Sequence, residues 1–195
     1  MGRRILILQG HPDATGAHLC HPLADAYEAG AREAGHDVRC IDLGHLDVPL
    51  LRSAQDWEHG ALPPSLADAQ AAIAWAEHVL LIFPLWVGDM PALLKAFLEQ
   101  VARPGFAFER GTRNPFEAKR LKGRSARVVV TMGMPALVYR WVYRAHSVRS
   151  LERNVLGFVG FAPVHETLIG GVGGLDETRV DTLRARLTRL GRAGD

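Results

Sequence analysis

The sequence lacks the features that mark secreted, membrane-spanning or nucleic-acid-binding proteins. Its 195 residues include only two cysteines, Cys20 and Cys40, which is too few for a disulfide framework and fits a reducing compartment. The apolar runs near residues 79–86 and 155–164 fall far short of the ~18 residues needed to span a bilayer. A net charge of +2 gives no argument for nucleic acid binding. We therefore expect a cytoplasmic protein with no membrane span and no nucleic acid partner.

The chain does contain a regular alternation of strand-like and helix-like segments. Hydrophobic residues make up 48% and charged residues 23%, as in an ordinary globular protein, and the length suits a single domain over residues 1–195. Short β-rich runs predict strands at 4–8, 37–43, 79–83, 126–131 and 164–169. Apolar stripes predict helices over about 17–34 and 138–156, a helix that opens at residues 63–65 and has apolar positions to 76, a helix with its apolar face at positions 94–101, and a final helix with apolar positions 180–190 that Gly191 ends.

Five strand–helix units with near-continuous apolar strands predict a parallel sheet that is covered on both faces. Right-handed crossovers then give an α/β fold, a three-layer doubly wound sandwich. We expect the flavodoxin-like strand order 2-1-3-4-5. In that order a ligand binds beyond the carboxyl ends of the strands, where the first and third strands diverge.

The segment Phe83-Pro84-Leu85-Trp86-Val87-Gly88-Asp89-Met90-Pro91 carries the strongest local signal. It follows an apolar strand and precedes a helix, so it predicts a tight loop at the carboxyl edge of the sheet. A loop with a large aromatic side chain, a glycine and exposed amides suits a flat ring with polar edges better than a small ion. We interpret it as one wall of a site for the isoalloxazine ring of a flavin.

The loop from Gln9 to His18 joins the first strand to the first helix. Free amides and the helix dipole make such a loop a natural anion site, and His11, Thr15 and His18 could donate hydrogen bonds. The spacing is neither the Walker nor the G-x-G-x-x-G pattern, so a plain turn with Asp13 or Thr15 capping the helix is an equal alternative.

A metal site is the second alternative for this region, because imidazole and thiolate are zinc ligands. His18 and His21 are only three residues apart at a helix start, and no second ligand pair follows at a spacing typical of zinc fingers. We therefore predict no metal, and we expect Cys20 to be a small buried residue.

A further loop, Thr131-Met132-Gly133-Met134-Pro135, follows the fourth predicted strand. Gly133 would let the backbone pass beneath a ring edge. Tyr139 and His146 are seven residues apart, so they share one face if the segment is helical. Beside a flavin, this pair could shield charge on the reduced ring or position a quinone oxygen. Alternatively, Tyr139 belongs to a packing surface with the aromatic residues that follow it.

Together these motifs resemble the flavodoxin-like NAD(P)H:quinone oxidoreductases, a group that includes DT-diaphorase, modulator of drug activity B and the ancillary proteins of potassium-efflux antiporters. The resemblance spans nearly the whole chain. It rests on His11-Pro12, on Phe83-Pro84-Leu85-Trp86 with Gly88, on Met90-Pro91-Ala92-Leu93-Leu94-Lys95, on Pro104-Gly105-Phe106-Ala107-Phe108, and on Gly133 with Tyr139.

The resemblance implies three sets of flavin contacts and a catalytic pair. The first loop would hold the phosphate through His11, Thr15, His18, Leu19 and Cys20. The loop after the third strand would pack on the ring and donate amides to it, through Pro84, Leu85, Trp86, Val87 and Gly88. The loop after the fourth strand would lie beside the pyrimidine edge, with Thr131, Met132, Gly133 and Met134. Tyr139 and His146 would be the catalytic residues beside the ring.

The resemblance also implies an activity and an assembly. Hydride would pass from NAD(P)H to a flavin, FMN or FAD, and then to a quinone-like acceptor by a ping-pong mechanism. The family is generally dimeric, and we expect the homodimer interface to involve residues 106–108 and 139–158. A rival function is a flavin-binding regulatory subunit of a membrane ion-efflux system. Its docking surface would be the basic stretch from Arg110 to Arg127, which could equally be a solvated face.

Overall fold

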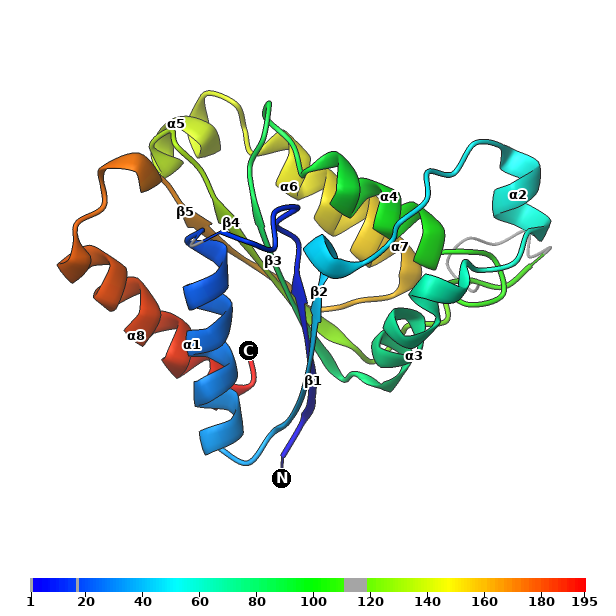
Figure 1. The fold of residues 1–195 in the computed structure, drawn as a ribbon, viewed down its shortest axis with the longest axis horizontal. Helices are drawn as coiled ribbons and strands as arrows, with labels where there is room; N and C mark the ends of the chain where they lie inside the picture. Colours follow the sequence, from blue (N-terminus) through cyan, green and yellow to red (C-terminus); the bar gives the residue numbers. More distant parts are fainter. Residues whose placement is uncertain (1, 17, 111–118) are drawn as a thin grey trace.

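The computed structural model describes residues 2–16, 18–110 and 119–195. Its five strands form one parallel sheet in the order β2-β1-β3-β4-β5 (Figure 1). The strands are β1 (Arg4–Gln9), β2 (Asp37–Asp42), β3 (His78–Pro84), β4 (Ser125–Thr131) and β5 (Val164–Ile169). The predicted α/β fold and strand order are therefore confirmed.

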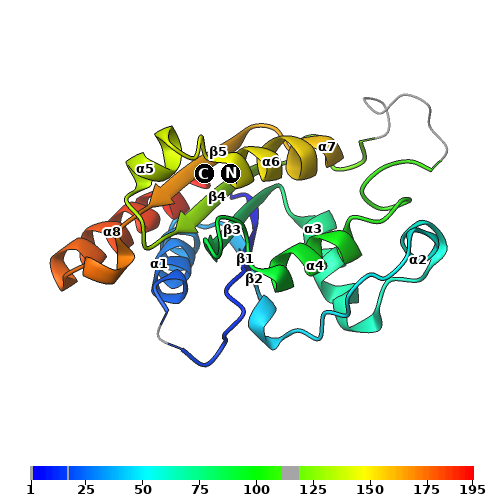
Figure 2. The same cartoon turned by 90° about the horizontal axis from the view of Figure 1, so that it is seen from above.

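Helices cover both faces of the sheet, which gives three layers. Helices α1 and α8 lie on one face, whereas α3, α4, α6 and α7 lie on the other (Figures 1 and 2). The helices are α1 (Cys20–Glu33), α2 (Ala54–His59), α3 (Ala67–Trp75), α4 (Ala92–Val101), α5 (Ala136–Trp141), α6 (His146–Ser150), α7 (Gly157–Val159) and α8 (Glu177–Ala193). Shorter turns are η1 (Leu43–His45), η2 (Pro64–Leu66), the π-helical η3 (Leu151–Leu156) and η4 (Val172–Gly174).

The three inner strands β1, β3 and β4 are largely apolar because both of their faces are buried, whereas the edge strands β2 and β5 are partly exposed and carry polar residues. Successive side chains of a strand point to opposite faces, so Ile5 and Ile7 pack under α1 and α8 while Leu6 and Leu8 join the core on the other side. Every residue of β3, the central strand, is buried. This explains why the inner strands read as nearly continuous apolar runs rather than as alternating patterns.

Two glycines inside helices bring α1 and α8 into close contact. A Cβ atom at Gly30 would lie 2.1 Å from the carbonyl oxygen of Thr188, and one at Gly191 would lie 2.0 Å from that of Tyr27. The prediction that Gly191 ends the last helix is therefore wrong. Helix α8 continues to Ala193 and is capped by Gly194, whose φ of 67° is left-handed.

The single helix predicted over 138–156 is also wrong. Helix α5 ends at Trp141, and the chain then turns through Arg144 and Ala145, whose φ values of 54° and 48° are left-handed. The chain continues as α6, η3 and α7. Within the described ranges, no helix combines the length and the apolar character that crossing a bilayer would require.

Candidate functional site

The segment after β3 forms a tight hairpin-like turn. The amide of Trp86 donates to the carbonyl of Asp89 at 2.8 Å, and the amide of Asp89 donates back to Trp86 at 3.0 Å. Val87 and Gly88 between them have φ values of 50° and 82°, the combination that a type I′ turn requires. A β-branched residue rarely takes this conformation, and the strain is worth roughly 1–3 kcal/mol. The Val87 side chain is fully exposed.

This turn leaves two backbone donors available to a ligand. The amide of Leu85 is used, because it donates to the carbonyl of Thr131 at 2.7 Å and so ties the loop after β3 to the end of β4. The amide of Trp86 is also used within the turn. In the described part of the chain, the amides of Val87 and Gly88 have no partner. The turn therefore presents two neighbouring N–H groups at the carboxyl edge of the sheet.

The loop after β4 forms the facing wall. Gly133 is exposed, and a Cβ atom built on it would meet nothing within 4 Å. Met134 is half-buried, whereas the Met132 side chain is buried in the core and its amide donates to Ile169 at 2.8 Å. The open positions of this loop are thus Gly133 and Met134, while Thr131 and Met132 lie beneath them.

A cavity of about 260 Å³ lies between these two loops and the segment after α5. The structure thus brings Tyr139 and His146 into one site even though the helix predicted to align them is broken. Tyr143, which the sequence placed only in a packing surface, is a further member of the site. The residues that line the cavity are Val87, Gly88, Met134, Tyr139, Tyr143 and His146.

The two predicted catalytic residues differ in their surroundings. Tyr139 is only 2% exposed, and its hydroxyl lies 2.6 Å from Oγ of Ser147. The amide of Val148 also donates to that hydroxyl at 3.4 Å. His146, at the start of α6, is exposed. The hydroxyl of Tyr139 is therefore engaged inside the protein, whereas the imidazole of His146 is open to the cavity and to solvent.

The loop between β1 and α1 gathers imidazole rings beside the turn after β3. The rings of His11 and His18 stack at 3.9 Å between centroids with 15° between their planes. The edge of His11 meets the Trp86 ring at 5.6 Å. Burial and the neighbouring His18 lower the pKa of His11. The first loop and the loop after β3 are therefore in direct contact, as the strand order requires.

Asp13 organises the rest of this loop. Its carboxylate accepts hydrogen bonds from the amide and the hydroxyl of Thr15 at 2.8 and 2.7 Å, and its other oxygen lies 2.8 Å from Nε2 of His18. The hydrogen bonds from His18 and Thr15 hold the pKa of Asp13 well below its usual range. Neither Asp13 nor Thr15 caps helix α1, which begins after Leu19 without any side-chain cap.

Cys20 is 1% exposed, as expected of a small buried residue, and its Sγ lies 3.3 Å from Oγ1 of Thr131. Burial raises the pKa of this thiol to about 11, so it is neutral and unreactive at physiological pH. The contact ties the start of α1 to the end of β4. Among the described residues, no group of three or more histidine, cysteine or acidic side chains is placed to hold a metal ion.

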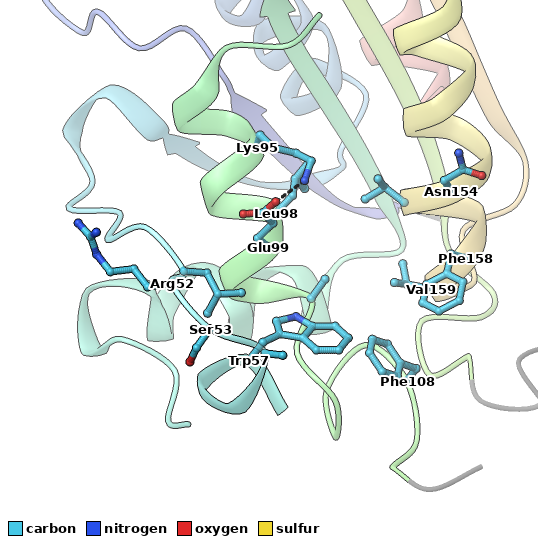
Figure 3. A pocket seen from close by; sticks show the side chains of 14 residues that line it. Arg52, Ser53, Trp57, Lys95, Leu98, Glu99, Phe108, Asn154, Phe158 and Val159 are labelled. Carbon is cyan, nitrogen blue, oxygen red and sulfur yellow. Dashed lines mark hydrogen bonds and ion pairs between the residues drawn. The ribbon is translucent and has the colours of Figure 1, made fainter. Parts of the chain in front are cut away.

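A larger cavity lies elsewhere, in an apolar groove of about 590 Å³. Figure 3 shows the groove between α4, the segment after it, and the η3–α7 region, with Trp57 on a further side. The Phe108 ring lies 5.5 Å from that of Trp57 and 5.5 Å from that of Phe158. None of the predicted cofactor contacts lines this groove.

Of the basic stretch from Arg110 to Arg127, residues 111–118, which include Arg113, lie outside the described residues, while Arg110, Arg120 and Lys122 are exposed. The guanidinium of Arg120 donates to the carbonyl of Gly105 at 2.8 Å. Arg127 is buried and donates to the Thr167 hydroxyl at 2.9 Å. Arg127 therefore belongs to the interior of the protein and not to a solvated or docking surface.

The fold is that of a doubly wound α/β protein, with a cavity beside the loops that follow β3 and β4 at the carboxyl edge of the sheet. More specifically, the chain belongs to the family described by the flavodoxin-like fold, whose family model matches residues 3–190.

Several known proteins are similar to this chain. An uncharacterised NAD(P)H oxidoreductase of Haemophilus influenzae is 26% identical over 176 residues, covering 88% of this chain and 86% of that protein. An FMN-dependent NADH:quinone oxidoreductase of Ruegeria pomeroyi is 29% identical over 134 residues, covering 61% of this chain and 65% of that protein. The solved NAD(P)H:quinone oxidoreductase from Methanothermobacter marburgensis superimposes with a TM-score of 0.78 at 26% identity, covering 98% of this chain and 96% of that one.

Proposed function

We propose that this protein is an FMN-dependent oxidoreductase that takes hydride from NAD(P)H and delivers it to a quinone-like acceptor by a ping-pong mechanism. The names of the similar proteins support the oxidoreductase class, the nicotinamide donor and the quinone acceptor, and one of them supports FMN over FAD. The observation that carries the proposal is the cavity in which the turn after β3, the loop after β4 and His146 meet.

The residues present fit a flavin. The unpartnered amides of Val87 and Gly88 suit the polar edge of a flat ring, and the open space above Gly133 lets such a ring lie against the backbone. A bound flavin would supply the hydride-transfer chemistry between the nicotinamide and the acceptor. The protein itself would supply fixed donors, an apolar wall from Met134 and a short approach between the reacting groups.

His146 is our candidate for proton transfer to the acceptor. A quinone that accepts hydride must also take up a proton, and the exposed imidazole of His146 in the wall of the cavity can hold one on a ring nitrogen. The phenol of Tyr143 lines the same cavity and can donate a hydrogen bond to an oxygen of the acceptor. Tyr139 would act as a positioning residue, because its hydroxyl is held by Ser147.

Rapid-mixing spectroscopy of the protein reconstituted with FMN tests this function. We expect NADH or NADPH to bleach the flavin absorbance without oxygen, and a simple benzoquinone to restore it. Steady-state rates at several concentrations of both substrates should give parallel double-reciprocal lines. Failure of the protein to retain flavin after reconstitution would contradict the proposed function. Intersecting double-reciprocal lines would contradict only the ping-pong mechanism.

We also propose that the protein is a homodimer that buries the apolar groove of Figure 3. The two segments predicted for the interface meet there, since Phe108 and Phe158 both line the groove. Phe158 is 42% exposed and lines this groove together with Trp57 and Phe108, and a contiguous exposed apolar surface of this kind is typical of a protein–protein interface.

We propose the cytoplasm as the location of the protein, because two unpaired cysteines are typical of a reducing compartment.

Sedimentation equilibrium tests the dimer. We expect wild-type protein to be dimeric and Phe158→Arg to shift it towards monomer, because a charge would be buried in an apolar contact. Ala185→Arg is the matched control, since it places the same charge on an exposed position of α8, in the opposite helix layer. A Phe158→Arg protein that remains as dimeric as the control would exclude this groove as the interface.

A further inference from the structure

Helix α5 and the two residues after it turn a set of apolar side chains to solvent. Leu137, Trp141 and Val142 are 70%, 75% and 71% exposed, whereas Tyr139 in the same segment is buried. The segment therefore has one face on the core and an apolar face outside. Single exposed apolar residues are normal on a protein surface, but a contiguous set is typical of an interaction site. The α5 patch is defined here by its exposed apolar members, Leu137, Val138, Trp141, Val142 and Tyr143.

The α5 patch reaches the cavity at the carboxyl edge of the sheet. Tyr143 belongs to the patch and also lines that cavity, and the exposed side chain of Val87 lines it from the turn after β3. Figure 1 shows α5 beyond the ends of the strands, at the end of the molecule away from α2. The cavity is therefore bordered by exposed apolar side chains from two different loops.

The charged side chains of this segment are all basic. The sequence has no acidic residue from position 118 to position 151, and Arg140, Arg144 and Arg149 are exposed. Arg140 forms an ion pair with Glu166 of β5. Within the described residues, the guanidinium groups of Arg144 and Arg149 have no hydrogen bond or ion pair. The acidic side chains on neighbouring segments are Asp89, Glu152 and Glu166. The α5 patch is therefore apolar with two unpaired arginines, a combination that suits an anionic surface.

A second copy of this chain does not suit the α5 patch. In a two-fold symmetric contact, the same surface of both copies meets. Arg144 and Arg149 of the two copies would then face one another, and like charges brought together in a contact are unfavourable. The groove proposed for the homodimer is lined by other residues, so the α5 patch lies outside it.

We propose that the α5 patch docks this protein on the surface of an anionic lipid bilayer. Tryptophan and tyrosine favour the headgroup region, because each has an apolar ring and one polar group. Trp141 and Tyr143 would lie at that level, with Leu137 and Val142 at the boundary of the acyl chains. Arg144 and Arg149 would meet the lipid phosphates. The apolar segment is short, so the attachment is peripheral and reversible.

Docking through this patch places the cavity beside the membrane. Because Tyr143 belongs to both, an acceptor dissolved in the bilayer reaches the cavity without first entering bulk water. This step rests on the proposed function, and it specifies the acceptor as a lipid-soluble quinone. The docking itself requires neither flavin nor turnover, so the two can be tested separately.

Co-sedimentation with lipid vesicles tests the docking. The protein would be mixed with vesicles of phosphatidylcholine and phosphatidylserine, and with vesicles of phosphatidylcholine alone. We expect binding to the mixed vesicles to be about tenfold tighter or more, because the unpaired arginines interact with anionic headgroups. High salt should weaken this binding, because it screens exposed charges.

An apolar variant assigns the binding to the α5 patch. Trp141→Ser/Val142→Ser should bind the mixed vesicles about tenfold more weakly than the wild type, because two apolar side chains no longer enter the bilayer. Both positions are exposed, so the urea midpoint should stay at the wild-type value. Leu50→Ser is the control, since Leu50 is 63% exposed outside the patch, and it should bind as the wild type does.

A charge variant assigns the preference for anionic lipid. Arg144→Gln/Arg149→Gln should bind mixed and neutral vesicles with nearly equal affinity. Arg186→Gln/Arg189→Gln is the matched control, because it removes the same charge from exposed positions of α8. The control should keep the wild-type preference.

The apolar variant also tests the acceptor. With a long-chain benzoquinone dissolved in the mixed vesicles, Trp141→Ser/Val142→Ser should turn over about tenfold more slowly than the wild type, because less enzyme is on the membrane. With a water-soluble benzoquinone, the two proteins should agree within about twofold, since neither residue lines the cavity.

The outcomes separate the docking from the proposed function. Wild-type protein that does not bind the mixed vesicles would overturn the docking, whatever its activity, and would leave an acidic protein as the partner to test. Wild-type binding by the apolar variant would exclude the α5 patch as the docking surface. Vesicle binding by protein that takes up no flavin would support the docking and contradict the proposed function. Equal slowing with both quinones would contradict the membrane route of the acceptor.

Discussion

Replacing Tyr139 with phenylalanine separates a structural role from a catalytic one. The Tyr139 hydroxyl is buried and bonded to Oγ of Ser147 at 2.6 Å. A net hydrogen bond of this kind contributes about 0.5–1.5 kcal/mol, and a buried hydroxyl left without a partner costs roughly 1–3 kcal/mol. The amide of Val148 would lose its acceptor as well. We therefore expect Tyr139→Phe to lower the free energy of unfolding by about 1–2 kcal/mol.

A double-mutant cycle in urea measures this directly. The single variants Tyr139→Phe and Ser147→Ala and the double variant would be unfolded without flavin, so that ligand binding does not contribute. We expect the double variant to be less destabilised than the sum of the singles, with a coupling energy of about 1 kcal/mol. Rapid-mixing measurements on the flavin-loaded proteins should then give a reductive half-reaction within about twofold of wild type.

One result would refute this reasoning. If Tyr139→Phe unfolds as the wild type does, shows no coupling to Ser147, and slows quinone reduction at least tenfold, the hydroxyl faces the acceptor during turnover. Tyr139 would then be a catalytic residue, as the sequence motif predicts, and the bond to Ser147 would be a resting arrangement. Loss of stability together with normal rates in both half-reactions would leave Tyr139 with a packing role only.

Two further predictions concern the ligand loops and acid stability. Gly133→Val should lower flavin affinity at least tenfold, because the added side chain would project into the proposed ring site. The urea midpoint should stay unchanged, because a Cβ atom at Gly133 would meet no protein atom within 4 Å. Unchanged flavin binding would contradict the assignment of this loop. Buried His78 has a pKa of about 4, lowered mainly by desolvation, so its contribution to stability is present above about pH 6.5 and is lost as the pH falls towards 4. The loss is about 3 kcal/mol, and His78→Gln should show a smaller decline in unfolding free energy over this range than the wild type does.

The inner strands could be predicted from the sequence because burial on both faces leaves a strong apolar signal, and the regular alternation of strands and helices then indicated the strand order. The helix ends were harder to predict, for a specific physical reason. A glycine can either end a helix in a left-handed conformation or allow close approach of another backbone. At Gly191 only the close approach of the Tyr27 backbone on α1 shows which of these two roles the glycine has. Local sequence does not reveal this contact, because the two residues are far apart in the chain.

The sequence could predict which loops form the candidate site, but not which individual amides and side chains within them are open to a ligand. Parallel topology brings the loops after β1, β3 and β4 together, so the composition of each loop was informative. Which atoms remain available depends on local conformation. The positive φ values at Val87 and Ala145 are not signalled by residue type, yet they decide which amides are open and how His146 reaches the cavity.

We take the strain at Val87 as support for the proposed ligand site at this edge of the sheet. A glycine at that position would relieve roughly 1–3 kcal/mol of strain, and the sequence uses glycine only at the next position. The bond from Leu85 to Thr131 and the paired bonds between Trp86 and Asp89 hold the turn in place. Two exposed amides that have no partner among the described residues are thereby left open to solvent or to an external acceptor.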